Sequence, residues 1–182
     1  MPSRSLPALA CCLVALAWSG CGGAPFSGTP DVPDGYATYR GEGVSFVHPA
    51  SWRPRTRSLG QGIAEIRFAD PQGRGRSTAA VVLTVQPGVG DRFGTEVQGQ
   101  RAVLEDVGGA TVEQDEVDVE HARQAFRSLI EIPDRGAGPS TSQAVDVLAR
   151  DGRHLALAAG GPDRNADRLD VDAVIGSLRL DP

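Results

Sequence analysis

Lysine is absent from this sequence of 182 residues, and all 18 basic residues are arginines. A chain without lysine cannot form a Schiff base through a lysine amine or supply the lysine of a phosphate-binding P-loop. Its 23 acidic residues outnumber the basic ones and give a net charge of −5. Because nucleic-acid binding requires a basic surface, this charge argues against a nucleic-acid partner.

Cysteine is confined to the beginning of the chain. The three cysteines are Cys11, Cys12 and Cys21, and residues 22–182 contain none. The longer segment therefore has no disulfide, no cysteine nucleophile and no thiolate zinc site. Its length suits a single domain, which must be stable through its hydrophobic core alone.

Residues 1–20 have the pattern of a cleavable export signal. A positive charge precedes an apolar run at 6–18, which is too short to span a bilayer because spanning takes about 20 apolar residues. Two small residues then lead to Cys21, and this junction resembles the bacterial lipobox, where the cysteine thiol receives a diacylglyceryl group before cleavage. Trp18 stands where that motif usually has leucine, so secretion without a lipid is the alternative. We expect Cys21 to carry a lipid anchor.

Residues 21–35 carry this anchor and are rich in glycine and proline, which is typical of a flexible tether. The remaining segment, 36–182, is expected to form the domain. Alternating and β-branched runs predict strands, and residues at helical spacing predict two helices. The expected strands are 36–40, 44–48, 63–69, 77–86, 111–121, 125–132, 144–149 and 154–159. The expected helices are 91–106 and 170–178, the second with Asp170 as its N-cap.

Consecutive hairpins in this order predict an α+β fold, with an antiparallel sheet of about six strands covered by two or more helices. Three segments resemble the PsbP-like domains of the LpqN-type actinobacterial lipoproteins: residues 43–52 (GVSFVHPASW), 68–71 (FADP) and 174–178 (VIGSL). The resemblance implies an α/β/α sandwich over about 36–180. It also implies a non-enzymatic domain that binds partners, assists assembly of larger complexes or contacts lipids, and it supplies no catalytic residues.

The densest polar stretch is 115–121. On a strand, Glu116, Asp118 and Glu120 would line one face, with neighbours on that face about 7 Å apart. Three carboxylates in a row suggest calcium, but a flat strand cannot bring them to one ion that needs roughly six to eight oxygen ligands. We interpret the row as a solvated sheet face with valines packed beneath it.

Arg53, Arg55 and Arg57 also alternate, which places three guanidinium groups on one side of an extended segment. Arg74 and Arg76 follow in a nearby loop. Together these side chains can receive a phosphate or carboxylate, or contact a partner. The alternatives are that they are edge-strand charges that oppose aggregation, or that they pair with the acidic row across the sheet.

The three histidines, His48, His121 and His154, show no spacing typical of a metal site. No Gly-x-Ser-x-Gly elbow of a hydrolase is present. We therefore predict a non-enzymatic protein without metal or cofactor.

The expected location is the extracytoplasmic face of the cell membrane, where the lipid on Cys21 anchors the chain. The expected function is to bind or help assemble another envelope component, either a protein or a lipid. A carrier that holds a lipid or glycolipid between the sheet and the 91–106 helix is the alternative, and a hydrolase is a third hypothesis.

Overall fold

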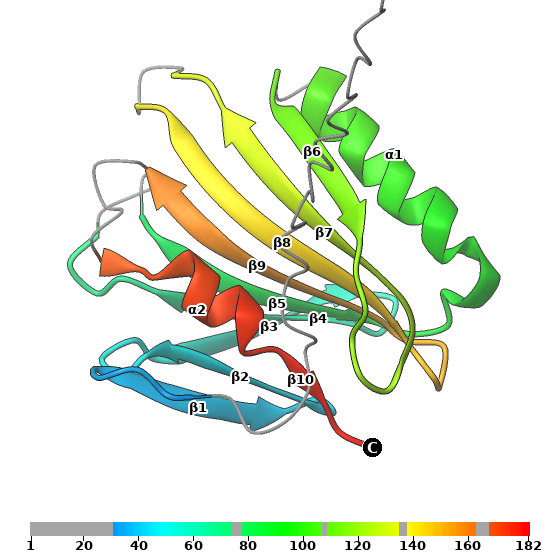
Figure 1. Ribbon diagram of the computed structural model, residues 1–182, viewed down its shortest axis with the longest axis horizontal. Coiled ribbons are helices and arrows are strands. Elements are labelled where there is room, and N and C mark those ends of the chain that lie inside the picture. The colour runs from blue at the N-terminus through cyan, green and yellow to red at the C-terminus, as the bar shows by residue number, and fades with distance from the viewer. Residues whose placement is uncertain (1–30, 74–77, 107–108, 135–137, 163–167) are drawn as a thin grey trace, which may run out of the picture.

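The computed structural model describes residues 31–73, 78–106, 109–134, 138–162 and 168–182. These residues form an α+β fold of two antiparallel sheets with two helices (Figure 1). The larger sheet has seven strands in the order β3-β4-β5-β9-β8-β7-β6, and the smaller has three in the order β1-β2-β10. Cys21, the export signal and most of the expected tether lie outside the described residues.

The strands of the small sheet are β1 (Tyr36–Gly41), β2 (Val44–Pro49) and β10 (Arg179–Leu180). The strands of the large sheet are β3 (Pro54–Gly60), β4 (Ile63–Ala69), β5 (Ala80–Gln86), β6 (Thr111–Glu116), β7 (Ala122–Ile132), β8 (Ser140–Ala149) and β9 (His154–Pro162). The helices are α1 (Phe93–Asp106), preceded by the 3-10 turn η1 (Gly90–Arg92), and α2 (Val171–Gly176).

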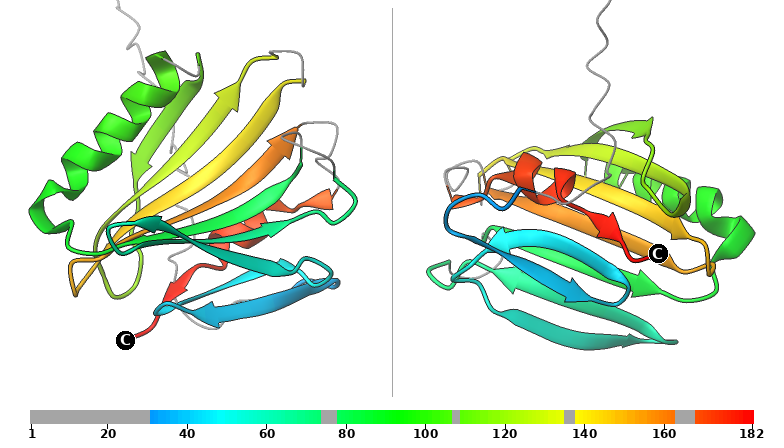
Figure 2. Two further views of the ribbon diagram at one scale, coloured as in Figure 1. Left: turned by 180° about the vertical axis from the view of Figure 1, so that it is seen from behind. Right: turned by 60° about the horizontal axis from the view of Figure 1, so that its bottom comes forward.

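The main core lies between the two sheets. Phe46 of β2 and Phe68 of β4 are fully buried and meet edge to face, with ring centroids 5.8 Å apart. Leu83 and Leu157 pair across β5 and β9 in the same core, and α2 adds Ile175. The small sheet and α2 therefore cover one face of the large sheet together (Figure 2).

The other face of the large sheet is covered in part by α1. Phe93 and Val97 of α1 are 1% and 2% exposed, and they pack with Leu148 and Phe126. The view from behind in Figure 2 shows α1 along the β6 side only, which leaves the strands nearer β3 without a helix over them. Among the described residues, no helix is long and apolar enough to cross a membrane.

Two tight turns shape the first half of the chain. At Glu42-Gly43 both residues have positive φ, 54° and 74°, which is typical of a type I′ hairpin turn. This turn joins β1 and β2, as expected from the sequence. The equivalent turn at Gln61-Gly62, with φ of 51° and 77°, joins β3 to β4.

The expected strand at 111–121 is too long, because β6 ends at Glu116. Val119 is buried in the main core, and His121 adopts a left-handed backbone with φ of 68° as the chain turns back into β7. Burial of one valine and the turn beside it thus override the alternating pattern. The large sheet also has more strands than expected, because the polar segment β3 joins it.

Candidate binding surface on strands β3 and β4

The alternating arginines lie at an edge of the large sheet. Arg55 and Arg57 are on β3, and their partners in register on β4 are Arg67 and Glu65. Arg53 precedes the strand and lines a groove together with Arg55 and Arg67. We call Arg53, Arg55, Arg57 and Arg67 the basic row, and all four residues are exposed.

Most of the positive charge in the basic row has no counter-charge among the described residues. Arg57 is neutralised by Glu65, with Nε and Nη2 each 3.0 Å from a carboxylate oxygen. Arg55 stands directly opposite Arg67, and like charges in that position are unfavourable. Arg53, Arg55 and Arg67 make no ion pair within the described part of the chain. Arg74 and Arg76, which the sequence places close by, lie outside the described residues.

The groove beside the basic row has a volume of about 410 Å³. Asp70 also lines it, but its carboxylate is engaged by Arg168 at 2.7 Å and by the Gln72 N–H at 2.8 Å. Burial opposes ionisation of Asp70, yet these hydrogen bonds and the charge of Arg168 together hold its pKa below the usual value. The carboxylate of Asp70 is therefore already engaged by Arg168 and the Gln72 N–H, and it forms no ion pair with the basic row.

His48 is a buried histidine whose ionisation is affected by Arg53 of the basic row. Its ring is 8% exposed, packs against Phe68 with centroids 4.2 Å apart, and has Nδ1 2.9 Å from the Pro49 carbonyl oxygen. Burial lowers the pKa of His48, the positive charge of Arg53 lowers it further, and the hydrogen bond opposes both. Of the basic row, Arg53 is therefore the residue whose charge acts on His48.

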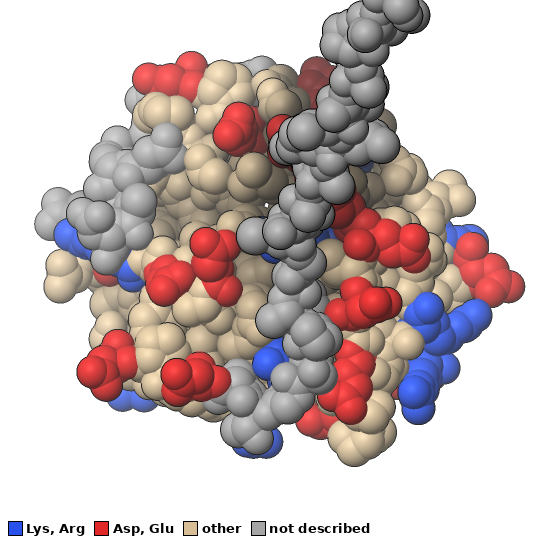
Figure 3. All heavy atoms as spheres, viewed as in Figure 1, with Lys and Arg blue, Asp and Glu red and all other residues tan. Residues whose placement is uncertain are grey.

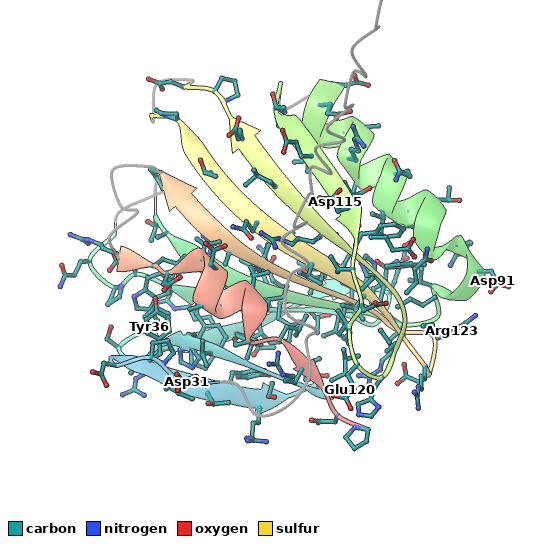
Figure 4. The ribbon with its side chains drawn as sticks, in the orientation of Figure 1. Asp31, Tyr36, Asp91, Asp115, Glu120 and Arg123 are labelled. Atoms are coloured by element: carbon teal, nitrogen blue, oxygen red, sulfur yellow. The ribbon has the colours of Figure 1, made fainter. Side chains whose placement is uncertain are left out.

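The acidic residues of 115–121 do not form the expected row. Glu116 ends β6, while Asp118 and Glu120 follow in the loop, and Figure 4 shows Asp115 and Glu120 well separated. Among the described residues, no three metal-ligating side chains are grouped closely enough to hold an ion. The alternative in which the arginines pair with this row is wrong for Arg55 and Arg57, because β3 and β6 are opposite edges of the sheet.

The structure does not bring the three histidines together. His121 lies in the turn, 3.6 Å from Glu120. His154 is buried 2.8 Å from the Asp146 carboxylate, and the ring of Phe93 packs against it at 5.1 Å. Sequence reasoning missed the Asp146–His154 pair, because contact between residues of β8 and β9 depends on strand register.

A second hollow, of about 250 Å³, lies between the large sheet and α2. Gln143 lines it, donates from Nε2 to Asp172 at 2.8 Å, and leaves its buried Oε1 without a hydrogen bond. The front of the molecule around this hollow carries scattered acidic side chains (Figure 3). The basic row points to the opposite face of the sheet.

No family model and no curated protein matches the chain. Among solved structures, it is similar to cyanobacterial PsbP from Synechocystis sp. PCC 6803, with a TM-score of 0.55 and 14% identity over 85% of this chain and 97% of that one. The fold is PsbP-like. A protein of unknown function from Pseudomonas aeruginosa is also similar, with a TM-score of 0.45 and 16% identity over 73% of this chain and 87% of that one. At 14% identity the similarity to cyanobacterial PsbP shows the fold alone, and no site residue is carried over.

Proposed function

We propose that this protein is an LpqN-type lipoprotein, anchored by Cys21 at the extracytoplasmic face of the cell membrane. Its PsbP-like domain is a non-catalytic module that binds or helps assemble an anionic component of the envelope. The observation that carries the proposal is the basic row. Three of its guanidinium groups have no counter-charge among the described residues, in a chain whose net charge is −5.

The electrostatics of the row favour an anionic partner. Guanidinium groups bind carboxylates and phosphates through paired hydrogen bonds, which are stronger when both groups are charged. The repulsion between Arg55 and Arg67 falls when an anion lies between them. Binding therefore relieves an unfavourable contact that the free domain retains.

The tether suits such a module. A glycine-rich chain of the length of residues 22–35 has a root-mean-square span on the order of 20 Å. The anchor would keep the domain near the membrane, while the tether lets its surface reach a component beyond the lipid headgroups.

The packing of α1 favours the module over the lipid carrier. Phe93 and Val97 contact the large sheet directly and occupy the space where the carrier hypothesis places its cavity. A hydrolase would need its catalytic side chains to converge, but the two buried histidines lie apart: His48 packs against Phe68 and His154 packs against Phe93.

The test is affinity capture from membranes with the full-length protein. The variant Arg53→Gln, Arg55→Gln, Arg67→Gln should lose its co-purifying envelope component. The matched control is Arg92→Gln, Arg101→Gln, Arg123→Gln, which removes the same charge from exposed ion pairs on or beside α1. Loss in the first variant with retention in the control supports the proposal. Equal capture by both variants contradicts it.

A further inference from the structure

We infer that the basic row receives an extended acidic segment of a partner protein, which adds to the free edge of β3 as a further strand. This inference rests on the proposed function and names the kind of partner that the same surface fits. It combines two features of β3, an unpaired backbone edge and a line of positive side chains.

The outer edge of β3 is free among the described strands. β3 is the first strand of the large sheet and pairs only with β4. All seven of its residues are exposed. In the right-hand view of Figure 2, the β3–β4 hairpin forms the lower margin of the molecule.

The turn between β3 and β4 determines which backbone groups of β3 face outward. The two-residue turn closes on the Gly60–Ile63 pair, so Ile63 and every second residue after it on β4 direct their N–H and C=O groups toward β3. The β3 residues that pair with the intervening β4 residues therefore point away from β4, and these are Pro54, Thr56 and Ser58. A proline, which has no N–H, is tolerated at such a position of an edge strand. The register is irregular between Ser58 and Gly60, so the regular series of outward N–H and C=O groups ends at Ser58. These groups can form a ladder with an added strand.

The arginines then determine which side chains the added strand should carry. Arg55 and Arg57 are about 7 Å apart along β3, which is the spacing of alternate residues on any strand. Arg55 has no counter-charge among the described residues, whereas Arg57 shares its charge with Glu65. An acidic residue at every second position of the partner would lie directly opposite each arginine. The Cβ atoms of such a pair are roughly 4.5–5.5 Å apart. Arg67, one strand further in, is within reach of the longer glutamate side chains.

The same features disfavour the addition of a neutral or basic strand. A neutral strand would leave Arg55 and Arg67 in their unfavourable contact, and a basic strand would add to it. Positive charges on an edge strand oppose unspecific pairing with strands of other chains. Here they would also favour an incoming strand that carries negative charges. A small single anion fits less well, because the guanidinium groups are spread in a line along the strand.

The experiment compares synthetic peptides on the full-length protein. One peptide alternates Glu with Thr, a second contains the same residues in two blocks, and a third alternates Gln with Thr. The alternating Glu peptide should bind about tenfold more tightly than the block peptide, because only it presents every carboxylate on one face. It should also slow amide exchange at Thr56 and Ser58. Equal binding of the two acidic peptides without protection of these amides overturns the inference and leaves the proposed function standing.

A charge-preserving variant separates the two proposals. Thr56→Pro removes an outward N–H and retains the whole basic row. It should bind the alternating peptide about tenfold more weakly, while its binding of inorganic polyphosphate stays unchanged. Unaltered peptide binding by folded Thr56→Pro contradicts strand addition. If thermal unfolding shows that this variant is not folded, amide exchange on the wild type decides. The proposed function itself fails when Arg53→Gln, Arg55→Gln, Arg67→Gln still captures its partner.

Discussion

Asp70 is buried at the end of β4, with 5% of its side chain exposed, and it is held as a carboxylate by Arg168. Burial acting alone would raise its pKa, but the hydrogen bonds from Arg168 and the Gln72 N–H outweigh burial, and the net pKa lies below 3.8. A carboxyl group whose folded pKa is lowered stabilises the protein above its unfolded pKa. That stabilisation is lost as the pH falls through the folded value.

We expect Asp70→Asn to lower the free energy of unfolding at pH 7 by about 1–3 kcal/mol, since charge-assisted bonds in a buried site are lost. The variant should also lose less stability than the wild type between about pH 5 and pH 2. Urea unfolding across this range measures both effects. Asp34→Asn, at an exposed position, is the control, and an identical acid profile for wild type and Asp70→Asn would contradict the assignment.

His48 links the basic row to the core. Its pKa is lowered from 6.5, first by burial and then by Arg53. The unfolded chain therefore takes up a proton more readily than the folded one, so His48 contributes stability above about pH 6.5 that is lost as the pH falls below that value. Removing the Arg53 charge should raise the pKa of His48.

An NMR titration of the His48 ring tests this link. Arg53→Gln should shift the titration to higher pH. Arg57→Gln should shift it less, because Arg57 is already paired with Glu65. Equal shifts in the two variants would mean that His48 responds to total charge and not to Arg53 in particular.

Ser177 joins α2 to β2 across 130 positions of sequence. Its hydroxyl accepts the Val47 N–H at 2.8 Å and donates to the Val174 carbonyl oxygen at 2.7 Å, and the residue is 4% exposed. This bond satisfies a backbone donor in the middle of a fully buried strand. It gives a structural reason for the serine in the segment VIGSL.

We expect Ser177→Ala to destabilise the protein by about 1–3 kcal/mol, because the buried Val47 N–H loses its partner. Chemical denaturation gives the free energy of unfolding. Ser51→Ala, at an exposed position, should change it by less than about 0.5 kcal/mol. Comparable losses in the two variants would refute this role for Ser177.

The elements that sequence periodicity predicted are those with an apolar face. β4 has the expected bounds, 63–69, and Asp170 caps α2 by accepting the Ala173 N–H at 2.9 Å. For β3 the sequence predicts only an extended segment, because it has no alternating apolar residues. Its place as an edge strand, where neither face needs to be apolar, explains the missing signal.

At the scale of the whole molecule, Cys21 should determine where the protein is found. A diacylglyceryl group gives durable attachment, whereas a single chain is marginal at about 0.8 kcal/mol per buried CH₂. We expect Cys21→Ala to appear in the soluble fraction or to remain unprocessed. Membrane fractionation with immunoblotting measures this, and a variant of mature size that stays with membranes would show that the anchor lies elsewhere.

The sequence by itself determined the properties that depend on local chemistry. Its cysteine-free segment 22–182 must be stable through its core, its alternating runs predicted most strands, and Arg53, Arg55 and Arg57 were expected on one side. The tertiary structure decided which of these residues meet. Arg67 stands opposite Arg55 through strand register, and Arg168 reaches Asp70 from 98 positions away. Register and strand order depend on how the entire apolar surface is buried, so no local pattern contains them.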